Sequence, residues 1–125
     1  MKIEWLSPSV DEGAITIYPT YIVLNKKASD VIHEAFKVAI GVNESNQLII
    51  RPISQDEFES SSIQNQIMYQ NITFTPSYAR ITGKSIVDCI KEKLNLDFSS
   101  QQSFKFKAKY NSVNKMIVVY TNKED

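Results

Sequence analysis

Short stretches in which apolar and polar residues alternate occur along the first half of the chain and predict β-strands. Val38, Ile40 and Val42 alternate with smaller or charged residues, so one face of their stretch is expected to be buried. β-branched and aromatic residues dominate the other stretches, as is typical of strands. We expect strands over residues 14–18, 21–24, 36–42 and 48–50, joined in part by a proline turn at 18–21 and an asparagine-rich turn at 43–46.

One segment between these strands has helical periodicity instead. Its apolar residues follow i, i+3, i+4 and i+7 spacing and form one helical face: Ala28, Val31, Ile32 and Ala35. Asn25 is expected to cap this helix, because its side chain can accept a hydrogen bond from a backbone amide that would otherwise lack a partner. A helix this short needs tertiary packing to be stable.

The second half of the chain repeats the first. Residues 15–21, Ile-Thr-Ile-Tyr-Pro-Thr-Tyr, return without a gap as residues 72–78, Ile-Thr-Phe-Thr-Pro-Ser-Tyr. The helical segment that begins at Asp30 returns at Asp88, and the hairpin that begins at Phe36 returns at Phe104. Because strand, turn, helix and hairpin all recur in the same order, we interpret the chain as an internal duplication.

The duplication divides the chain into four parts. These are a lead-in at 1–13, repeat 1 at 14–53, a polar linker at 54–71 and repeat 2 at 72–121. In repeat 2 we expect strands at 72–75, 78–81, 104–110 and 116–120, a helix at 84–94 capped by Thr82, and an insertion at 95–103. We expect Trp5 and Leu6 of the lead-in to pack on the domain, with Ile63, Ile67, Met68 and Tyr69 as possible anchors of the linker.

One repeat alone has too few strands and too short a helix to bury a stable core. Two repeats in one chain can share a core about an intramolecular pseudo-two-fold axis, as two subunits of a dimer would. The predicted fold class is therefore α+β, a duplicated strand-strand-helix-hairpin unit in a single domain.

This order of elements resembles the AbrB-like swapped-hairpin proteins, and the tandem arrangement is similar to MraZ-like proteins. The resemblance is carried by Tyr21-Ile22-Val23-Leu24-Asn25 before the first helix, Leu94-Asn95-Leu96 before the second hairpin, and the hairpins at 37–51 and 105–120. It implies a swapped-hairpin fold and a small DNA-binding protein of the transcription-regulator type.

Charge is unevenly distributed along a chain whose formal net charge is zero. Residues 1–62 hold five Lys/Arg and nine Asp/Glu, whereas residues 63–125 hold nine Lys/Arg and five Asp/Glu. Such polarity can create a basic face on a neutral protein. It is equally consistent with two lobes that attract each other within or between chains.

The basic residues of repeat 2 are the candidate DNA-binding site. Lys105, Lys107 and Lys109 follow strand spacing, so all three side chains should lie on one sheet face. The other members of the candidate surface are Arg80, Lys84, Lys91 and Lys93. Because Arg51 and Arg80 are the only arginines, binding would depend on backbone phosphates more than on base edges. The structural alternative is a solvated edge strand protected by lysines.

Other chemistry-bearing residues have simpler structural interpretations. Cys89 replaces Val31 of the first repeat, which favours a small buried apolar role over a reactive thiol. His33 is expected to be an exposed helix residue, and the Asp30/Glu34 and Asp88/Glu92 pairs to be surface charges. The tyrosines and phenylalanines of the strands could stack on single-stranded nucleic acid, but their alternation favours the core or the interface between the repeats: Tyr18, Tyr21, Tyr78, Phe104, Phe106, Tyr110 and Tyr120.

No nucleophile–base pair, metal cluster or phosphate loop is visible, so we expect a non-enzymatic protein with no cofactor, metal or evident small-molecule ligand. The longest apolar runs are short and no signal peptide is apparent, which favours a cytoplasmic protein with no membrane contact. The expected partners are duplex DNA and a second copy of the chain. The alternative function is a protein-interaction or self-assembly module that does not bind nucleic acid.

Overall fold

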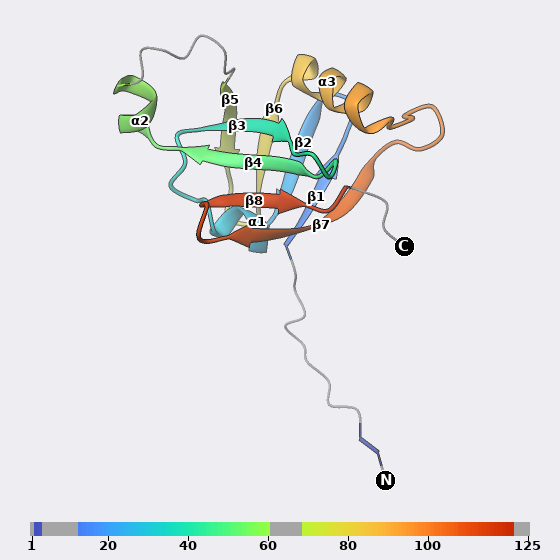
Figure 1. Ribbon diagram of the computed structural model, residues 1–125, viewed down its shortest axis with the longest axis horizontal. Helices are drawn as coiled ribbons and strands as arrows, with labels where there is room; N and C mark the ends of the chain where they lie inside the picture. Colours follow the sequence, from blue (N-terminus) through green and yellow to red (C-terminus); the bar gives the residue numbers. More distant parts are fainter. Residues whose placement is uncertain (1, 4–12, 61–68, 122–125) are drawn as a thin grey trace.

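The computed structural model describes residues 2–3, 13–60 and 69–121 (Figure 1). The expectations for Trp5 and Leu6, and for Ile63, Ile67 and Met68 of the linker, lie outside these residues. In chain order the elements are β1 (Gly13–Ile17), β2 (Tyr21–Asn25), α1 (Lys26–Asp30), β3 (Lys37–Val42), β4 (Leu48–Ile53), α2 (Gln55–Ser60), β5 (Tyr69–Phe74), β6 (Tyr78–Thr82), α3 (Lys84–Leu94), β7 (Phe104–Asn111) and β8 (Met116–Val119).

The eight strands form one closed antiparallel barrel, in the order β1-β2-β6-β5-β3-β4-β8-β7. The expected α+β swapped-hairpin fold is therefore wrong, and so is the AbrB-like fold that the resemblance implied. The strands themselves lie close to where alternation predicted them, and α3 has the predicted bounds. The error arose because local patterns define strands but do not reveal that β1 and β7 pair and close the sheet.

The two halves of the chain are interleaved around this ring. Four pairs, β1–β2, β3–β4, β5–β6 and β7–β8, are hairpins within a half, and the remaining four, β1–β7, β2–β6, β3–β5 and β4–β8, join the halves. Each strand of the first half has a counterpart in the second: β1 and β5, β2 and β6, β3 and β7, β4 and β8. If every strand is exchanged for its counterpart, the order of strands around the ring does not change. Acidic and basic halves therefore do not form separate lobes.

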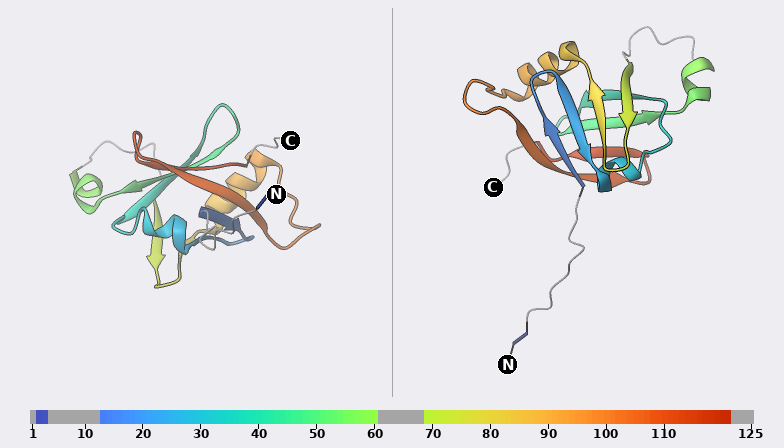
Figure 2. Two further views of the ribbon diagram at one scale, coloured as in Figure 1. Left: turned by 90° about the horizontal axis from the view of Figure 1, so that it is seen from below. Right: turned by 180° about the vertical axis from the view of Figure 1, so that it is seen from behind.

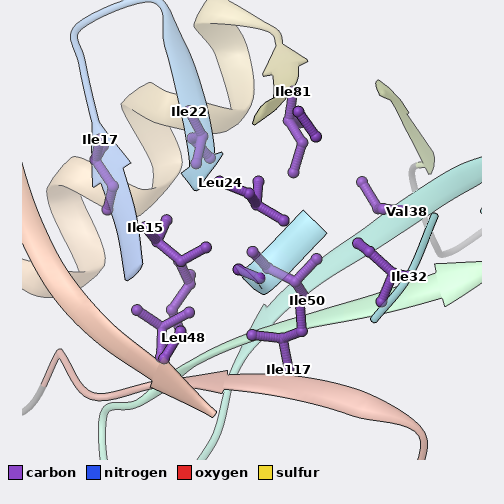
Figure 3. Packing of buried hydrophobic residues seen from close by; sticks show 14 of the residues in the cluster. Ile15, Ile17, Ile22, Leu24, Ile32, Val38, Leu48, Ile50, Ile81 and Ile117 are labelled. Carbon is purple, nitrogen blue, oxygen red and sulfur yellow. The ribbon is translucent and has the colours of Figure 1, made fainter. Parts of the chain in front are cut away.

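A single aliphatic core fills the barrel, as Figure 3 shows. Alternate residues of each strand point inward, and both halves contribute fully buried side chains such as Ile15, Leu24, Leu48, Ile81 and Val119. This burial is the main source of stability, at about 25 cal/mol per Å² of apolar surface removed from water.

The tyrosines among the strand aromatics do not enter this core, so that part of the expectation is wrong. Tyr21 nevertheless lies at the predicted interface between the repeats, because Arg80 of repeat 2 contacts its ring. Tyr18, Tyr21 and Tyr78 alternate with the buried residues of their strands and therefore point outward, where they are half-buried. Tyr110 and Tyr120 are each 37% exposed. Of the described aromatics in the prediction, Phe106 packs against the core and Phe104 is half-buried.

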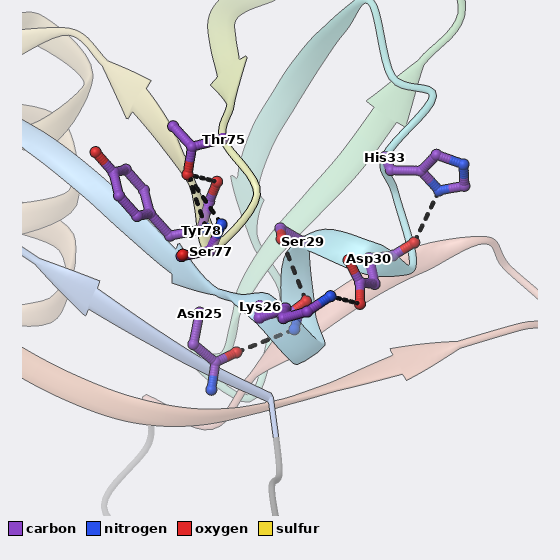
Figure 4. A network of polar contacts seen from close by, with 9 residues as sticks. Asn25, Lys26, Ser29, Asp30, His33, Thr75, Ser77 and Tyr78 are labelled. Atoms are coloured by element: carbon purple, nitrogen blue, oxygen red, sulfur yellow. Dashed lines mark hydrogen bonds and ion pairs between the residues drawn. The ribbon is translucent and has the colours of Figure 1, made fainter.

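Helices α1 and α3 lie at opposite ends of the barrel (Figure 1). Asn25 caps α1 as predicted, its Oδ1 accepting a hydrogen bond from the Ala28 amide at 3.0 Å (Figure 4). The same oxygen accepts a second hydrogen bond from the Ala14 amide at 3.1 Å. The predicted cap at Thr82 is wrong, because α3 begins after Gly83 with no side-chain cap. The predicted helix over 28–35 is also shorter than expected and ends at Asp30, so Val31 is 41% exposed while Ile32 remains buried.

The polar linker contains an unexpected helix, α2. The hydroxyl of Ser54 accepts a hydrogen bond from the Glu57 amide at 3.1 Å, which satisfies one of the unpaired donors at the helix start. Phe58 anchors α2 to the outside of the barrel, with its ring centroid 5.4 Å from those of Phe36 and Tyr69. Within the described residues, none of the helices is long and apolar enough to cross a membrane.

The insertion after α3 forms an ordered loop around Asp97. Ser99 donates to the Asp97 carboxylate from its hydroxyl (2.5 Å) and its amide (3.0 Å). These bonds, led by that from the hydroxyl, lower the pKa of Asp97. The loop brings Leu96 and Phe98 against the core.

Candidate nucleic-acid interface

The charges of the barrel wall all have one sign. The eight strands contain no Asp or Glu, whereas they carry Lys37, Arg51, Arg80, Lys105, Lys107 and Lys109. The described acidic residues all lie on helices, turns or loops. A strand wall without carboxylates presents a positive surface although the chain as a whole is neutral.

Strand β7 provides the densest part of this surface. Lys105, Lys107 and Lys109 are exposed and alternate with the inward residues Phe106 and Ala108, as the spacing predicted. Successive lysines are therefore about 7 Å apart along the strand. Strand β7 pairs with both β1 and β8, so the alternative interpretation of these lysines as protection for an edge strand is wrong. Among the described residues, Lys105 and Lys109 have no carboxylate partner.

Arg80 lies on the same outer face as these lysines. The strand registers place Lys105 beside Thr16, Thr16 beside Val23, and Val23 beside Arg80. These four residues form one row across β7, β1, β2 and β6, with Lys105 at one end and Arg80 at the other. Three strand spacings of about 4.8 Å each separate the two ends. The right panel of Figure 2 looks onto the outer side of β1, β2 and β6.

Aromatic rings lie between these cations. Tyr18 and Tyr21 stack with their ring centroids 4.6 Å apart, and the Arg80 guanidinium lies 4.6 Å from the Tyr21 centroid. The Tyr21 ring therefore holds the guanidinium by a cation–π contact. We call the outer surface formed by Lys105, Lys107, Lys109, Arg80, Tyr18, Tyr21, Thr16 and Val23 the basic face.

The α3 lysines of the candidate site belong to another part of the molecule, at the end of the barrel. Lys84 forms an ion pair with Asp88 at 3.1 Å, and the first repeat contains the equivalent pair, Lys26 with Asp30 at 3.0 Å. Lys91 contributes to the lowered pKa of Asp97, and Lys93 is exposed. The candidate residues are therefore divided between the strand wall, which carries Arg80 and the β7 lysines, and α3, which carries Lys84, Lys91 and Lys93.

The remaining strand cations are occupied by the contacts that hold α2. Arg51 pairs with Glu57 at 2.8 Å. Lys37 donates to Asn71 and lies 5.3 Å and 5.6 Å from the ring centroids of Phe36 and Phe58. These two residues fix α2 and do not extend the basic face.

Other predicted roles have mixed outcomes. Cys89 is exposed, so its predicted burial is wrong: the buried positions of α3 are Val87 and Ile90, and Cys89 follows the outward side. His33 is exposed as expected, although it lies in the turn after α1. Its Nδ1 approaches the carbonyl oxygen of Asp30 at 2.9 Å (Figure 4). Within the described part of the chain, no three His, Cys, Asp or Glu side chains are grouped as metal ligands.

Sequence reasoning identified the lysines but missed the Tyr18–Tyr21–Arg80 stack. The signal was available, because Tyr18 is next to the inward Ile17 and Tyr21 is next to the inward Ile22. Neighbouring side chains of a strand point to opposite faces, so both tyrosines should point outward. Comparisons of the chain with family models, curated proteins and solved structures found no match, so the resemblance in sequence to AbrB-like proteins remains a prediction.

Proposed function

We propose that this protein is a non-enzymatic, cytoplasmic nucleic-acid-binding protein that binds DNA through the basic face. One observation carries the proposal: a row of outward lysines and a tyrosine-stacked arginine share a surface whose described strands contain no Asp or Glu. The fold resemblance no longer supports it, because the barrel is not a swapped hairpin.

The chemistry of this face favours the sugar–phosphate backbone. Lysine ammonium groups bind phosphates as point charges, and each neutralised phosphate releases counterions, which makes affinity fall with salt. With one arginine on the face, reading of guanine edges in the major groove is limited. Tyr18 and Tyr21 add ring surfaces on which an unpaired base can stack. A role in transcription regulation would additionally require preference for one duplex sequence.

Fluorescence anisotropy with a labelled random-sequence duplex, at low and at near-physiological salt, tests the proposal. The variant carries Lys105→Glu, Lys107→Glu and Lys109→Glu. The matched control, Lys91→Glu with Lys93→Glu and Lys115→Glu, changes the net charge equally at exposed residues outside the basic face. We expect binding that weakens with salt and is lost in the β7 variant, because three phosphate contacts account for a slope of about −2.7 in log affinity against log salt.

Two results would contradict the proposal. One is no binding by the unaltered protein at low salt. The other is an equal loss of DNA affinity in the β7 variant and in the control variant. That result would show that binding depends on net charge and not on a defined surface. A single-stranded probe with a Tyr18→Ala variant then measures stacking, expected at about 1–3 kcal/mol per stacked base.

The alternative of a self-assembly module remains a prediction, and sedimentation equilibrium without DNA tests it. An oligomer whose mass changes with salt, and that binds neither the duplex nor the single-stranded probe, would support that alternative.

A further inference from the structure

A cavity of about 320 Å³ lies at the α1 end of the barrel, between α1 and strands β1, β7 and β8. Its walls are largely apolar and include Ala28, Val31, Ala108, Tyr110 and Ile117. Cavities that hold small molecules in proteins begin at about 300 Å³ and are mostly apolar, with a few polar groups that orient the ligand.

The internal duplication shows why the cavity exists. Three small residues line it, Gly13, Ala28 and Ala108. When the repeats are aligned on Ile15/Ile72, Asp30/Asp88 and Phe36/Phe104, the counterparts of those three residues are Gln70, Ile86 and Ile40. The chain therefore uses larger side chains at each equivalent position of the other barrel end, where Leu96 and Phe98 also pack against the core.

The cavity opens to solvent, so its apolar walls stay in contact with water and the chain loses the stability that burying them would give. One change that the second repeat already contains, isoleucine for Ala28, would reduce this loss. Gly13 is small for a packing reason, because a Cβ there would lie 2.9 Å from the Ala108 carbonyl oxygen. Ala28 and Ala108 have isoleucine counterparts at the other barrel end, and their smaller side chains leave space that a bound ligand would fill.

The charged groups of the cavity define the ligand class. Lys27 and Lys109 line it, and within the described part of the chain no carboxylate does. Val31 and Tyr110 also line the neighbouring, wider opening of about 500 Å³, which includes Glu34 and Glu57. That opening also includes Lys115, and its Glu57 pairs with Arg51. Lys27 and Lys109 are therefore the charges that attract an anion into the smaller cavity.

We propose that this cavity binds a small molecule with an apolar body and one anionic group, such as an aliphatic carboxylate. The apolar body occupies the space beside Ala28 and Ala108, and the anionic group pairs with Lys27 and Lys109. This inference does not depend on nucleic-acid binding.

Titration with hexanoate, followed by amide chemical shifts in NMR, tests the site, with 1-hexanol as the uncharged counterpart. We expect saturable shifts at Ala28, Val31 and Ala108 with a Kd on the order of 1 mM, as suits a ligand of few atoms. Ala28→Ile should weaken binding of both compounds at least ten-fold, whereas Ile86→Ala, the inverse change at the other barrel end, should leave it unchanged. Lys27→Gln with Lys109→Gln should weaken hexanoate several-fold and leave hexanol unaffected.

Three outcomes would overturn the proposal. The first is no saturable shift, or shifts that persist in a folded Ala28→Ile or Ala108→Ile protein. The second is equal binding of hexanol and hexanoate, which would remove the anionic group from the ligand class. The third is a change in the emission of Trp5, the single tryptophan, on Ala28→Ile without ligand, which would identify the chain's own N-terminal segment as the occupant.

Discussion

The two ends of the barrel use the same structural unit in different ways. At one end α3 has 11 residues and buries Val87 and Ile90, while Leu96 and Phe98 of the following loop add to the core. At the other end α1 has five residues, and an apolar cavity lies beside it. Two copies of one duplicated unit therefore fill the two ends of the barrel to different extents.

The largest expected effect is a loss of stability when one buried isoleucine at each end of the barrel is truncated. Ile90→Ala and Ile32→Ala remove equivalent side chains that are 2% and 4% exposed. We expect losses of about 2–5 kcal/mol in the free energy of unfolding, with Ile90→Ala the larger because Ile32 already borders open space. Urea denaturation measures both, and a larger loss for Ile32→Ala would contradict the view that the α1 end is the less filled one.

A smaller effect is expected where β1 meets β7. A Cβ on Gly13 would lie 2.9 Å from the carbonyl oxygen of Ala108, so Gly13→Ala must push the two strands apart. We expect Gly13→Ala to destabilise the protein by about 1–3 kcal/mol. Gly41→Ala is the matched control, because a Cβ there meets nothing within 4 Å. Thermal unfolding compares them, and equal melting temperatures would show that the β1–β7 contact is not as tight as described.

The smallest of these effects compares the helix starts. Asn25→Ala removes the acceptor for the amides of Ala28 and Ala14 and should cost about 1–2 kcal/mol. Thr82→Ala, at the start of α3, should change stability by no more than about 0.5 kcal/mol, since Thr82 is exposed and provides no cap. Chemical denaturation distinguishes the two, and a Thr82→Ala loss as large as that of Asn25→Ala would disprove the assigned caps.

Local features of this chain were predictable because their signals are local. The bounds of α3, the Asn25 cap and the outward direction of the β7 lysines follow from periodicity and side-chain chemistry within a few residues. Helix α2 was missed although Ser54-Gln55-Asp56-Glu57 matches the S/T-x-x-E capping pattern, because the surrounding polar residues resemble a linker.

Pairing between distant strands was not predictable in the same way. Nothing in the residues of β1 specifies that Gly13 lies opposite Ala108, and the closure of the barrel depends on that pairing. The prediction that tyrosines enter the core failed for a related reason. Once the sheet closes, the inward positions are occupied by aliphatic residues such as Ile17 and Ile22, and Tyr18 and Tyr21 point outward.

The interleaved ring also imposes an order on biosynthesis. Strands β1 and β3 leave the ribosome early and can pair at once with their hairpin neighbours. The strands that pair with their other sides, β7 and β5, belong to the second half of the chain. At about 5–20 residues per second, β1 waits on the order of 10 s for β7. During that time its unpaired side can pair with another nascent chain. The closed barrel, which has no free strand edge when complete, is therefore most exposed to misassembly before the second copy is made.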